Sequence, residues 1–316
     1  MGGVLSYLDE SFPPSSHFNP DSHIPDLSGK VVIITGASSG VGKATSKHLL
    51  MHNAKVYMAC RDIDKATTAI DELWKETGKE AFFLHLDLAD LASTKQAAEE
   101  FLRNEPQLHI LFNNAGVMMT PMSELTADGY DRQFGVHVLG HFCFTTALFP
   151  ALMAAATATG SPSRVIHSSS VLQILSKTVD FETLRPSTER DKKGPIGLYA
   201  QSKFANIVFS KELARRYGDK GIVSICLNPG TVKTDLQRFW SSTQHFLLGW
   251  MLYPPELGAH TGLWAATSSE AEHFNGKYLV PWARLGQTPT AADSLELGQG
   301  LWDWMEAQLV GVGSLP

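Results

Sequence analysis

Short apolar runs alternate with segments of helical periodicity through most of this 316-residue chain. The apolar runs have the length and the β-branched content of buried strands, and the segments between them repeat apolar residues at helical spacing. This alternation predicts right-handed βαβ units, which build a parallel sheet with helices on both faces. We expect strands at KVVIITG, KVYMAC, EAFFLHLDL, LHILFNNAG, RVIHSSS and GIVSICLNPG, and a seventh at GKYLVP (276–281).

These elements predict an α/β fold, with one doubly wound parallel sheet of about seven strands in a single domain over residues 30–310. Residues 1–29 are rich in Pro, Ser, Asp and His, so we expect an irregular N-terminal arm there. Residues 128–156 are apolar around much of their helical circumference, which predicts one long buried helix.

Composition and charge narrow the functional classes. Lys and Arg total 26 against 32 Asp and Glu, a formal net charge of −6, so nucleic acid is not an expected partner. The cysteines, Cys60, Cys143 and Cys226, are far apart, which argues against a disulfide framework or a thiolate zinc site. We find neither a secretory signal nor an 18-residue apolar run, and therefore expect a cytoplasmic protein without a transmembrane segment.

A glycine-rich loop follows the first expected strand. In VVIITGASSGVGKAT the glycines are Gly36, Gly40 and Gly42, spaced G-x-x-x-G-x-G between a strand and a helix. Gly36 permits a sharp turn, and the other two let backbone approach a pyrophosphate at the helix N-terminus. An ordinary turn is the alternative interpretation. The complete strand–loop–helix context favours dinucleotide binding in a Rossmann-like fold.

The end of the second expected strand bears on cofactor choice. An acidic residue at this place usually binds the ribose 2′-hydroxyl of NAD, whereas an arginine accommodates the 2′-phosphate of NADP. Here Arg61 comes first and Asp62 follows, and Lys43 could add positive charge near the loop. The alternative is that Arg61 and Lys43 are solvated surface charges. We predict NADP(H) in preference to NAD(H).

Four motifs stand in one order along the chain: TGASSGVG, NNAG (113–116), YAQSK (199–203) and NPG (228–230). Together they resemble the short-chain dehydrogenase/reductase family over about residues 24–285. ACRD, GHF and SKFANIVFSKELARR are most similar to its retinol-dehydrogenase-like and protochlorophyllide-reductase-like branch, and the arm FPPSSHFNPDSHIPDLSGKVVIITG is similar to fungal members. The resemblance implies a cofactor that lies across the carboxyl ends of the strands.

The same resemblance implies roles for the polar residues. Tyr199 would be the acid or base that moves the proton of a carbonyl or alcohol oxygen. Lys203 would lower its pKa and hold the nicotinamide ribose, and Ser170 would bind the substrate oxygen. The residue chemistry agrees, because a free tyrosine titrates near 10, a nearby ammonium favours phenolate, and positions i and i+4 share a helix face.

The resemblance also implies which residues line the cofactor and the substrate. The cofactor set is Gly36, Ser38, Ser39, Gly40, Val41, Gly42, Lys43, Arg61, Asp87, Leu88, Asn114, Ala115, Gly116, Tyr199, Lys203, Pro229, Gly230, Val232 and Thr234. The substrate set is Ser170, Leu172, Phe239 and Trp240.

Two segments depart from the family pattern or add to it. Ser170 and Tyr199 are 199 − 170 = 29 positions apart, longer than the family's common spacing, so residues 172–197 hold an insertion at the mouth of the site. Residues 231–258 would cap the substrate. Their aromatics would suit a large apolar substrate, or they are core or interface residues: Phe239, Trp240, Phe246, Trp250 and Tyr253.

His137 stands where most family members carry an asparagine that is thought to hold a relay water. Histidine donates and accepts hydrogen bonds and titrates near 6.5, so we assign His137 to the catalytic group, as part of an altered proton relay. That assignment predicts an inflection in the pH–rate profile between about pH 5 and 8. The alternatives are an extra acid aimed at the substrate, a lost relay, or a tolerated substitution. His141 lies four residues on, but no third ligand follows at a usual spacing, and no metal is expected.

The predicted function is an NADP(H)-dependent oxidoreductase that reduces a carbonyl, or oxidises an alcohol, of a bulky and largely apolar small molecule. A place in fungal secondary metabolism is expected, and reduction of C=C or C=N bonds is an open variant. The alternative is an NADPH-binding protein without redox turnover, either a sensor or an enzyme that uses the cofactor structurally. The predicted partner is a small-molecule substrate, with a homodimer as the candidate assembly.

Overall fold

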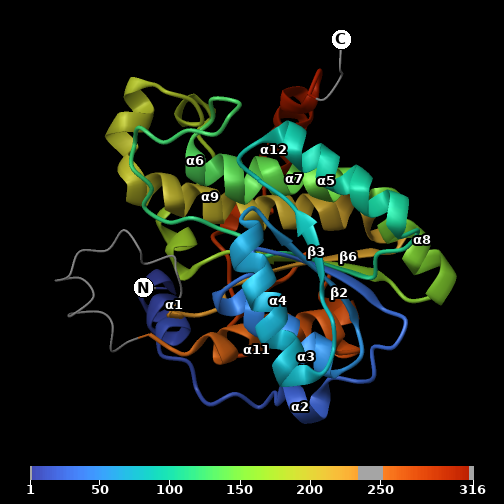
Figure 1. Ribbon diagram of the computed structural model, residues 1–316. Coiled ribbons are helices and arrows are strands. Elements are labelled where there is room, and N and C mark those ends of the chain that lie inside the picture. The colour runs from blue at the N-terminus through green and yellow to red at the C-terminus, as the bar shows by residue number, and fades with distance from the viewer. Residues whose placement is uncertain (1, 234–251, 313–316) are drawn as a thin grey trace.

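The computed structural model describes residues 2–233 and 252–312, and its centre is one eight-stranded sheet (Figure 1). The strand order is β3-β2-β1-β4-β5-β6-β7-β8. All neighbours pair in parallel except β7 and β8, which are antiparallel. The strands are β1 (Val31–Thr35), β2 (Lys55–Cys60), β3 (Phe82–His85), β4 (Ile110–Asn113), β5 (Ser163–Ser168), β6 (Ile222–Leu227), β7 (Tyr278–Val280) and β8 (Arg284–Leu285).

The doubly wound parallel sheet predicted from the alternation is therefore confirmed. The central strands are apolar throughout because helices cover both faces, as in β1, whose five residues are all buried. The seventh predicted strand is present as β7. β8 was not predicted, since a run of two residues is too short to show an alternating pattern.

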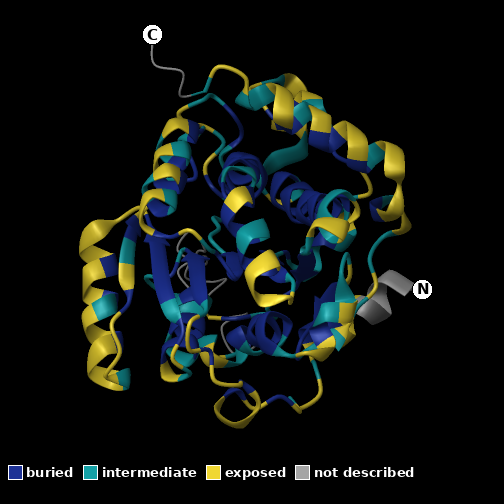
Figure 2. Ribbon diagram, turned by 90° about the vertical axis from the view of Figure 1, so that its right-hand side faces the viewer, coloured by how far each residue is buried: buried dark blue, intermediate teal, exposed yellow. Residues whose placement is uncertain are grey.

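Two layers of helices enclose the sheet (Figures 1 and 2). One layer contains α5 (Leu91–Asn104), α7 (His141–Ala147), α9 (Thr188–Tyr217) and α12 (Leu295–Leu309), whose apolar side chains form one core cluster with the sheet. The other is formed by α3 (Gly40–Met51), α4 (Ile63–Thr77) and α11 (Pro255–Thr267). Figure 2 shows the central strands dark blue, and the outward faces of the helices yellow.

Local sequence signals explain where several of these helices begin and end. Asp62 caps α4 by accepting the backbone N–H of Lys65, and Asp90 caps α5 by accepting those of Ala92 and Ser93. α4 ends at Gly78, whose φ of 66° lies in the left-handed region that glycine adopts at little cost. These helices therefore start directly after the strand ends that face the site.

The N-terminal segment differs from the irregular arm expected at residues 1–29. It contains the helix α1 (Gly2–Ser11) and a single turn, α2 (Pro20–His23). Pro and Ser cluster after residue 12, and the composition of the whole segment hid a ten-residue helix in its first part.

The single helix expected at residues 128–156 is four elements. α6 (Arg132–Phe134) passes into a π-helix, η1 (Gly135–Gly140), then α7, and α8 (Phe149–Thr159) follows after a break at Leu148. Pro150 stands in the first turn of α8, where its missing N–H is tolerated and where it cannot continue the preceding helix.

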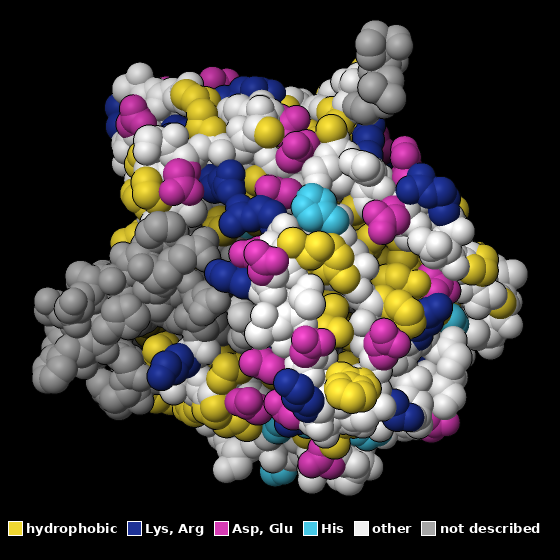
Figure 3. Space-filling model, in the orientation of Figure 1, with side chains coloured by type: hydrophobic (Ala, Val, Ile, Leu, Met, Phe, Trp, Pro, Cys, Tyr) yellow, Lys and Arg dark blue, Asp and Glu magenta, His cyan; other side chains and the backbone are white. Residues whose placement is uncertain are grey.

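Among the described residues, no single helix is both long and apolar enough to cross a membrane. Two consecutive segments, Arg132–Ala147 and Phe149–Thr159, meet at a bend of 55°. They have the length and hydrophobicity of a membrane span only when they are taken together. Most side chains of α7 and about half of those of α8 are buried within the fold. On the face in Figure 3, acidic and basic side chains are interspersed, with no extended area of one sign over its described atoms.

The insertion at residues 172–197 folds into two short 3-10 helices, η2 (Val171–Leu175) and η3 (Phe181–Thr183), and the first turns of α9. α9 is interrupted at Gly194, whose φ of 64° is left-handed. Arg190 anchors this segment. Its guanidinium pairs with the carboxylate of Asp131 at 3.0 Å and donates to the carbonyl of Met122 at 2.8 Å, and both members of the pair are buried.

We expect Arg190→Met to lower the free energy of unfolding by about 3–5 kcal/mol, because it leaves the Asp131 carboxylate buried without its partner. Urea denaturation followed by circular dichroism measures the change. Lys192→Met is the matched control, since Lys192 pairs with Glu189 at 3.6 Å on the surface and should leave the midpoint unchanged. Equal midpoints for the two variants would contradict the anchoring role.

Candidate active site

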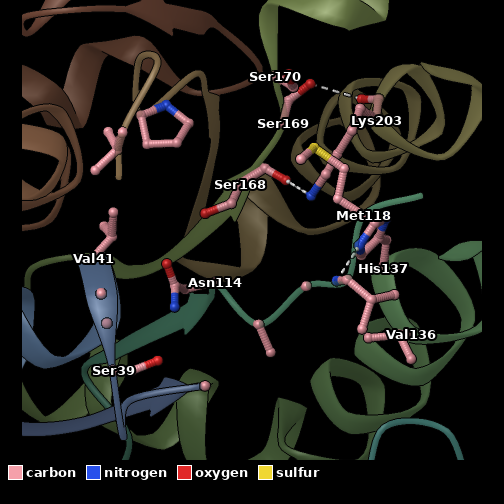
Figure 4. A pocket seen from close by; sticks show the side chains of 18 of the residues that line it. Ser39, Val41, Asn114, Met118, Val136, His137, Ser168, Ser169, Ser170 and Lys203 are labelled. Atoms are coloured by element: carbon pink, nitrogen blue, oxygen red, sulfur yellow. Dashed lines mark hydrogen bonds between the residues drawn. The ribbon is translucent and has the colours of Figure 1, made fainter. Parts of the chain in front are cut away.

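A cavity of about 520 Å³ lies at the carboxyl ends of the strands. In open α/β sheets this is where ligands bind, near the point at which the strand order reverses, here between β1 and β4. The cavity collects most of the residues predicted from the sequence: Gly36, Ser38, Ser39, Gly40, Val41, Gly42, Arg61, Asp87, Leu88, Asn114, Ala115, Gly116, His137, Ser170, Leu172, Tyr199, Lys203, Pro229, Gly230 and Val232. Figure 4 shows several of their side chains around the cavity.

Two glycines of the glycine-rich loop, Gly36 and Gly42, have no room for a side chain. Gly36 has a φ of 68°, and a Cβ there would lie 2.9 Å from the Cα of Ala115. A Cβ on Gly42 would lie 2.5 Å from the carbonyl oxygen of Gly36. α3 starts at Gly40 with no side-chain cap and no acidic residue in its first turn. Its first N–H groups therefore suit an anion such as a pyrophosphate.

Thr35, the last residue of β1, ties this loop to the end of β4. Its hydroxyl oxygen accepts the backbone N–H groups of Asn114 and Ala115, each at 2.9 Å. The side-chain amide of Asn114 donates back to the Thr35 carbonyl at 2.9 Å, and His141 Nε2 lies 2.9 Å from the same hydroxyl. Asn114 thus holds two strand ends together at the floor of the cavity.

Charges at the end of β2 separate into two groups. Arg61 and Lys65 line the cavity, and no carboxylate among the described residues pairs with either. Asp62 lines the cavity as well, and its carboxylate also caps α4. Lys43 does not line the cavity, because its ammonium pairs with Glu72 of α4, so the expectation that Lys43 serves the cofactor loop is not supported by its position.

Tyr199 and Lys203 are buried one turn apart on α9. The Lys203 ammonium lies 5.7 Å from the centre of the Tyr199 ring and donates to the Ser168 carbonyl at 3.1 Å. Ser169 donates to the Lys203 carbonyl at 2.8 Å, so the end of β5 and α9 are joined twice, as Figure 4 shows. Ser170 lies two residues beyond β5, and its hydroxyl oxygen accepts the N–H of Leu172 at 3.3 Å.

Burial dominates the ionisation of this pair. It raises the pKa of Tyr199 to about 12, although the hydrogen bond to Ser170 acts in the opposite direction. It also lowers the pKa of Lys203 to about 8. The expectation that the ammonium lowers the tyrosine pKa is therefore not met, since desolvation of the phenolate is the larger effect. At neutral pH the tyrosine is a neutral phenol, which is a proton donor.

His137 lies on the π-helix η1, and two protein groups outside that helix hold its ring. Its Nε2 accepts the N–H of Val117 at 2.9 Å, and its Nδ1 lies 2.8 Å from the hydroxyl of Ser202. That hydroxyl donates to the Tyr199 carbonyl at 2.7 Å, so Nδ1 must carry the proton and donate to Ser202. Both nitrogens of the neutral ring are thereby satisfied.

Burial, with smaller effects of Lys203 and His141, lowers the pKa of His137 well below 6.5. The predicted inflection between about pH 5 and 8 does not fit this environment, since protonation of Nε2 would destroy the bond from Val117. The ring instead packs edge-on against Tyr199, with centroids 5.7 Å apart. These contacts favour a positioning role for His137 over the predicted relay.

His137 and His141 do not face a shared centre. Nδ1 of His141 donates to the His137 carbonyl at 3.0 Å, and its Nε2 is bonded to Thr35. Burial lowers the pKa of His141 to about 3. Within residues 2–233 and 252–312, no three His, Cys, Asp or Glu side chains gather as metal ligands would.

The predicted substrate cap lies mostly outside the described residues, and so do Thr234, Phe239, Trp240, Phe246 and Trp250. Tyr253 is described and packs edge-on against Trp282, with ring centroids 5.2 Å apart, while its neighbour Leu252 lines the cavity.

Sequence reasoning missed several residues of the cavity wall: Tyr7, Ser11, Cys60, Lys65, Val117, Met118, Met119, Arg132, Val136, Val171, Asn228, Thr231 and Leu252. For some of them a signal existed. Lys65 lies in the first turn of the helix that follows Arg61, and Met118 and Met119 come one residue after NNAG. Tyr7 and Ser11 lie in the segment expected to be irregular, so nothing in the pattern placed them here.

Comparisons with known proteins agree with this geometry. The family described as short chain dehydrogenase matches residues 30–177. A short-chain dehydrogenase/reductase of Armillaria gallica is 51% identical, over 98% of this chain and 99% of that protein. Retinol dehydrogenase 11 of Mus musculus is 41% identical, over 90% and 88%. The 3-ketoacyl-(acyl-carrier-protein) reductase of Brucella melitensis, solved with NADH, has a TM-score of 0.63 at 25% identity and covers 80% of this chain and 96% of its own.

The bonded, neutral state of His137 can be tested without any turnover. We expect its ring nitrogens to keep constant chemical shifts, with the proton on Nδ1, from pH 5 to pH 8 in ¹⁵N-histidine NMR spectra. His137→Asn identifies the signal by removing it. A midpoint for that signal within this pH range would restore the relay interpretation.

Proposed function

The chain belongs to the short-chain dehydrogenase/reductase family, in its retinol-dehydrogenase-like branch, and is an oxidoreductase by that membership; from this premise we propose that it uses NADP(H) to reduce a carbonyl, or oxidise an alcohol, of a bulky and largely apolar small molecule. The observation that carries the proposal is a single cavity. It joins an uncapped helix N-terminus at Gly40 to the group of Ser170, Tyr199 and Lys203.

The residues fit a dinucleotide along the whole cavity. The loop from Gly36 to Gly42 would take the pyrophosphate, since its glycines allow close backbone approach and α3 starts there without a side-chain cap. Asp87 and Leu88 would lie along the adenosine, and Lys203 would hold the nicotinamide ribose. The bound nicotinamide would supply or accept the hydride.

Ser170 and Tyr199 would bind the substrate oxygen through their hydroxyl groups. In reduction, Tyr199 would donate its proton to that oxygen as carbon accepts the hydride, and the phenolate left behind would be stabilised by the Lys203 ammonium. A tyrosine pKa of about 12 favours the donor form, so the substrate complex needs this ammonium before the tyrosine can act as a base.

The proposed preference for NADP(H) is supported by Arg61 and Lys65. Both line the cavity at the end of β2, where the ribose of the adenosine half would lie, and the neighbouring carboxylate of Asp62 accepts the N–H of Lys65. A guanidinium forms short, charge-assisted hydrogen bonds with phosphate oxygens.

The proposed apolar substrate is supported by the side chains beyond Ser170. Val171, Leu172, Met118, Met119 and Leu252 line the wall there, and the thioethers can adapt to irregular ring systems. Fungal secondary metabolism remains our prediction for the pathway, in keeping with the Armillaria gallica relative. The alternative without redox turnover gains no support from His137, because both nitrogens of that ring are bonded within the protein.

Arg61→Ala should weaken NADPH binding by about 1.5–3 kcal/mol, roughly 10- to 150-fold, while NADH binding stays within about twofold. Fluorescence titration of each reduced cofactor measures the two dissociation constants. Lys43→Ala is the matched control, because Lys43 pairs with Glu72 away from the cavity and should change neither. Equal weakening of both cofactors by Arg61→Ala would refute the phosphate contact.

Tyr199→Phe should lower kcat by about 10²–10⁴-fold with NADPH affinity retained, because only the proton donor is lost. Oxidation of NADPH, followed by absorbance on a panel of ketones and aldehydes, measures the loss. Tyr217→Phe is the control on the same helix, since Tyr217 packs against Trp302 and Phe149 far from the cavity, and it should keep full activity. An active Tyr199→Phe variant would mean that the proton has another source.

A further inference from the structure

α1 lies against the end of the cavity that holds Ser170, and not against the glycine-rich end. It packs on η2, the turn that follows Ser170, and on the last strands of the sheet. Figure 1 shows it, in dark blue, at the edge of the sheet. We propose that α1 is a fixed wall of the substrate site, in which Tyr7 determines the size of substrate admitted and Glu10 positions the loop opposite. The proposal deepens the proposed function and rests on it.

Two consecutive residues, Asp9 and Glu10, anchor α1 to the rest of the protein. Arg284 of β8 pairs with the Asp9 carboxylate at 3.0 Å and donates to the Asp9 carbonyl at 3.2 Å. Glu10 is only 1% exposed, and its Oε2 accepts the amide of Asn228 at 2.9 Å and the hydroxyl of Tyr278 at 3.1 Å. A buried carboxylate with such donors is expensive to displace, so this helix is fixed in place.

Glu10 also acts on the loop that would face the nicotinamide. It accepts from the amide nitrogen of Asn228, which orients the side chain so that its carbonyl oxygen accepts the N–H of Gly230 at 3.0 Å. Pro229, Gly230 and Thr231 all line the cavity. The carboxylate thus reaches the site through Asn228, as a positioning residue.

Tyr7 and Ser11 are one helical turn apart and both line the cavity. They are on the same end as Leu172, which lies on the η2 turn that α1 contacts. Ser11 is buried, whereas the Tyr7 side chain is partly exposed, at 38%. A ring at the rim of a largely apolar cavity limits the width of the ligand that can enter beside it. The ligand class is a cyclic, largely apolar ketone.

The size limit can be measured with ketones of graded width. We expect Tyr7→Ala to raise the ratio of kcat/KM for a tricyclic ketone over that for cyclohexanone at least tenfold, with the NADPH dissociation constant within twofold. Leu8→Ala is the matched control, because Leu8 lies on the same helix, is 48% exposed and does not line the cavity. It should leave the ratio within twofold. A ratio unchanged by Tyr7→Ala, or raised equally by Leu8→Ala, would overturn the proposal.

Measurements of ketone binding distinguish a failure of this proposal from a failure of the proposed function. The dissociation constants of the same ketones are measured by calorimetry on protein loaded with NADP⁺, where no turnover is needed. If the ketones bind without being reduced, the proposed function fails and the binding ratio still decides the role of Tyr7. If no ketone binds to the wild-type protein, the assignment of α1 to a ketone site is wrong.

The role of Glu10 has its own readout. Glu10→Met should speed hydrogen exchange of the Gly230 amide at least tenfold, since the side-chain amide of Asn228 then loses its acceptor. Asp9→Ala removes the carboxylate of the neighbouring anchor and should change that exchange less than threefold. Equal protection of Gly230 in the wild-type protein and Glu10→Met would show that Glu10 only attaches the helix.

Discussion

The site depends on how closely the backbone at the end of β1 approaches the backbone at the end of β4. Gly36 and Ala115 are in contact with no space for a further carbon atom, and the Thr35 hydroxyl accepts two N–H groups of the opposite strand end. A hydroxyl oxygen that accepts twice also needs an acceptor for its own proton, and the Phe112 carbonyl and His141 lie within reach. This contact brings the start of α3 beside the end of β4, whose other neighbour is β5, the strand that leads to α9, so anion binding and proton transfer can share one cavity.

The strands and the order of the motifs could be predicted because buried parallel strands are apolar throughout and the glycine positions follow from close approach. Because the strand ends were predicted, so was the meeting of the site residues in one cavity: the cofactor loop, Arg61, Asn114, Ser170, Tyr199 and Lys203. Two kinds of feature could not be predicted. A π-turn has the composition of the α-helix around it, so nothing separated Gly135–Gly140 from its surroundings. Ion pairing across helices, as for Lys43 and Glu72, depends on tertiary geometry that periodicity does not contain.

His137 illustrates the limit of reasoning from residue type. The capacity of imidazole to titrate suggested a proton relay, but charge state follows from the environment. The buried His137 ring is neutral: its Nε2 accepts the N–H of Val117, and its Nδ1–H donates to the hydroxyl of Ser202. The wider turn of the π-helix and the small Gly116 beside it make room for a ring larger than asparagine, since a Cβ on Gly116 would lie 3.1 Å from Nε2. Tyr199 is then supported from one side by an edge-on ring.

The bond between Glu10 and Tyr278 joins residues 268 positions apart, nearly the whole length of the protein. During synthesis, α1 leaves the ribosome long before its partners on β7 and β8. The central βαβ units can pair by short crossovers in the meantime, since local closure costs less entropy than long-range closure. The helix α1 is consequently made before the central strands but docks after them, and the substrate end of the cavity matures only when β7 and β8 have been made.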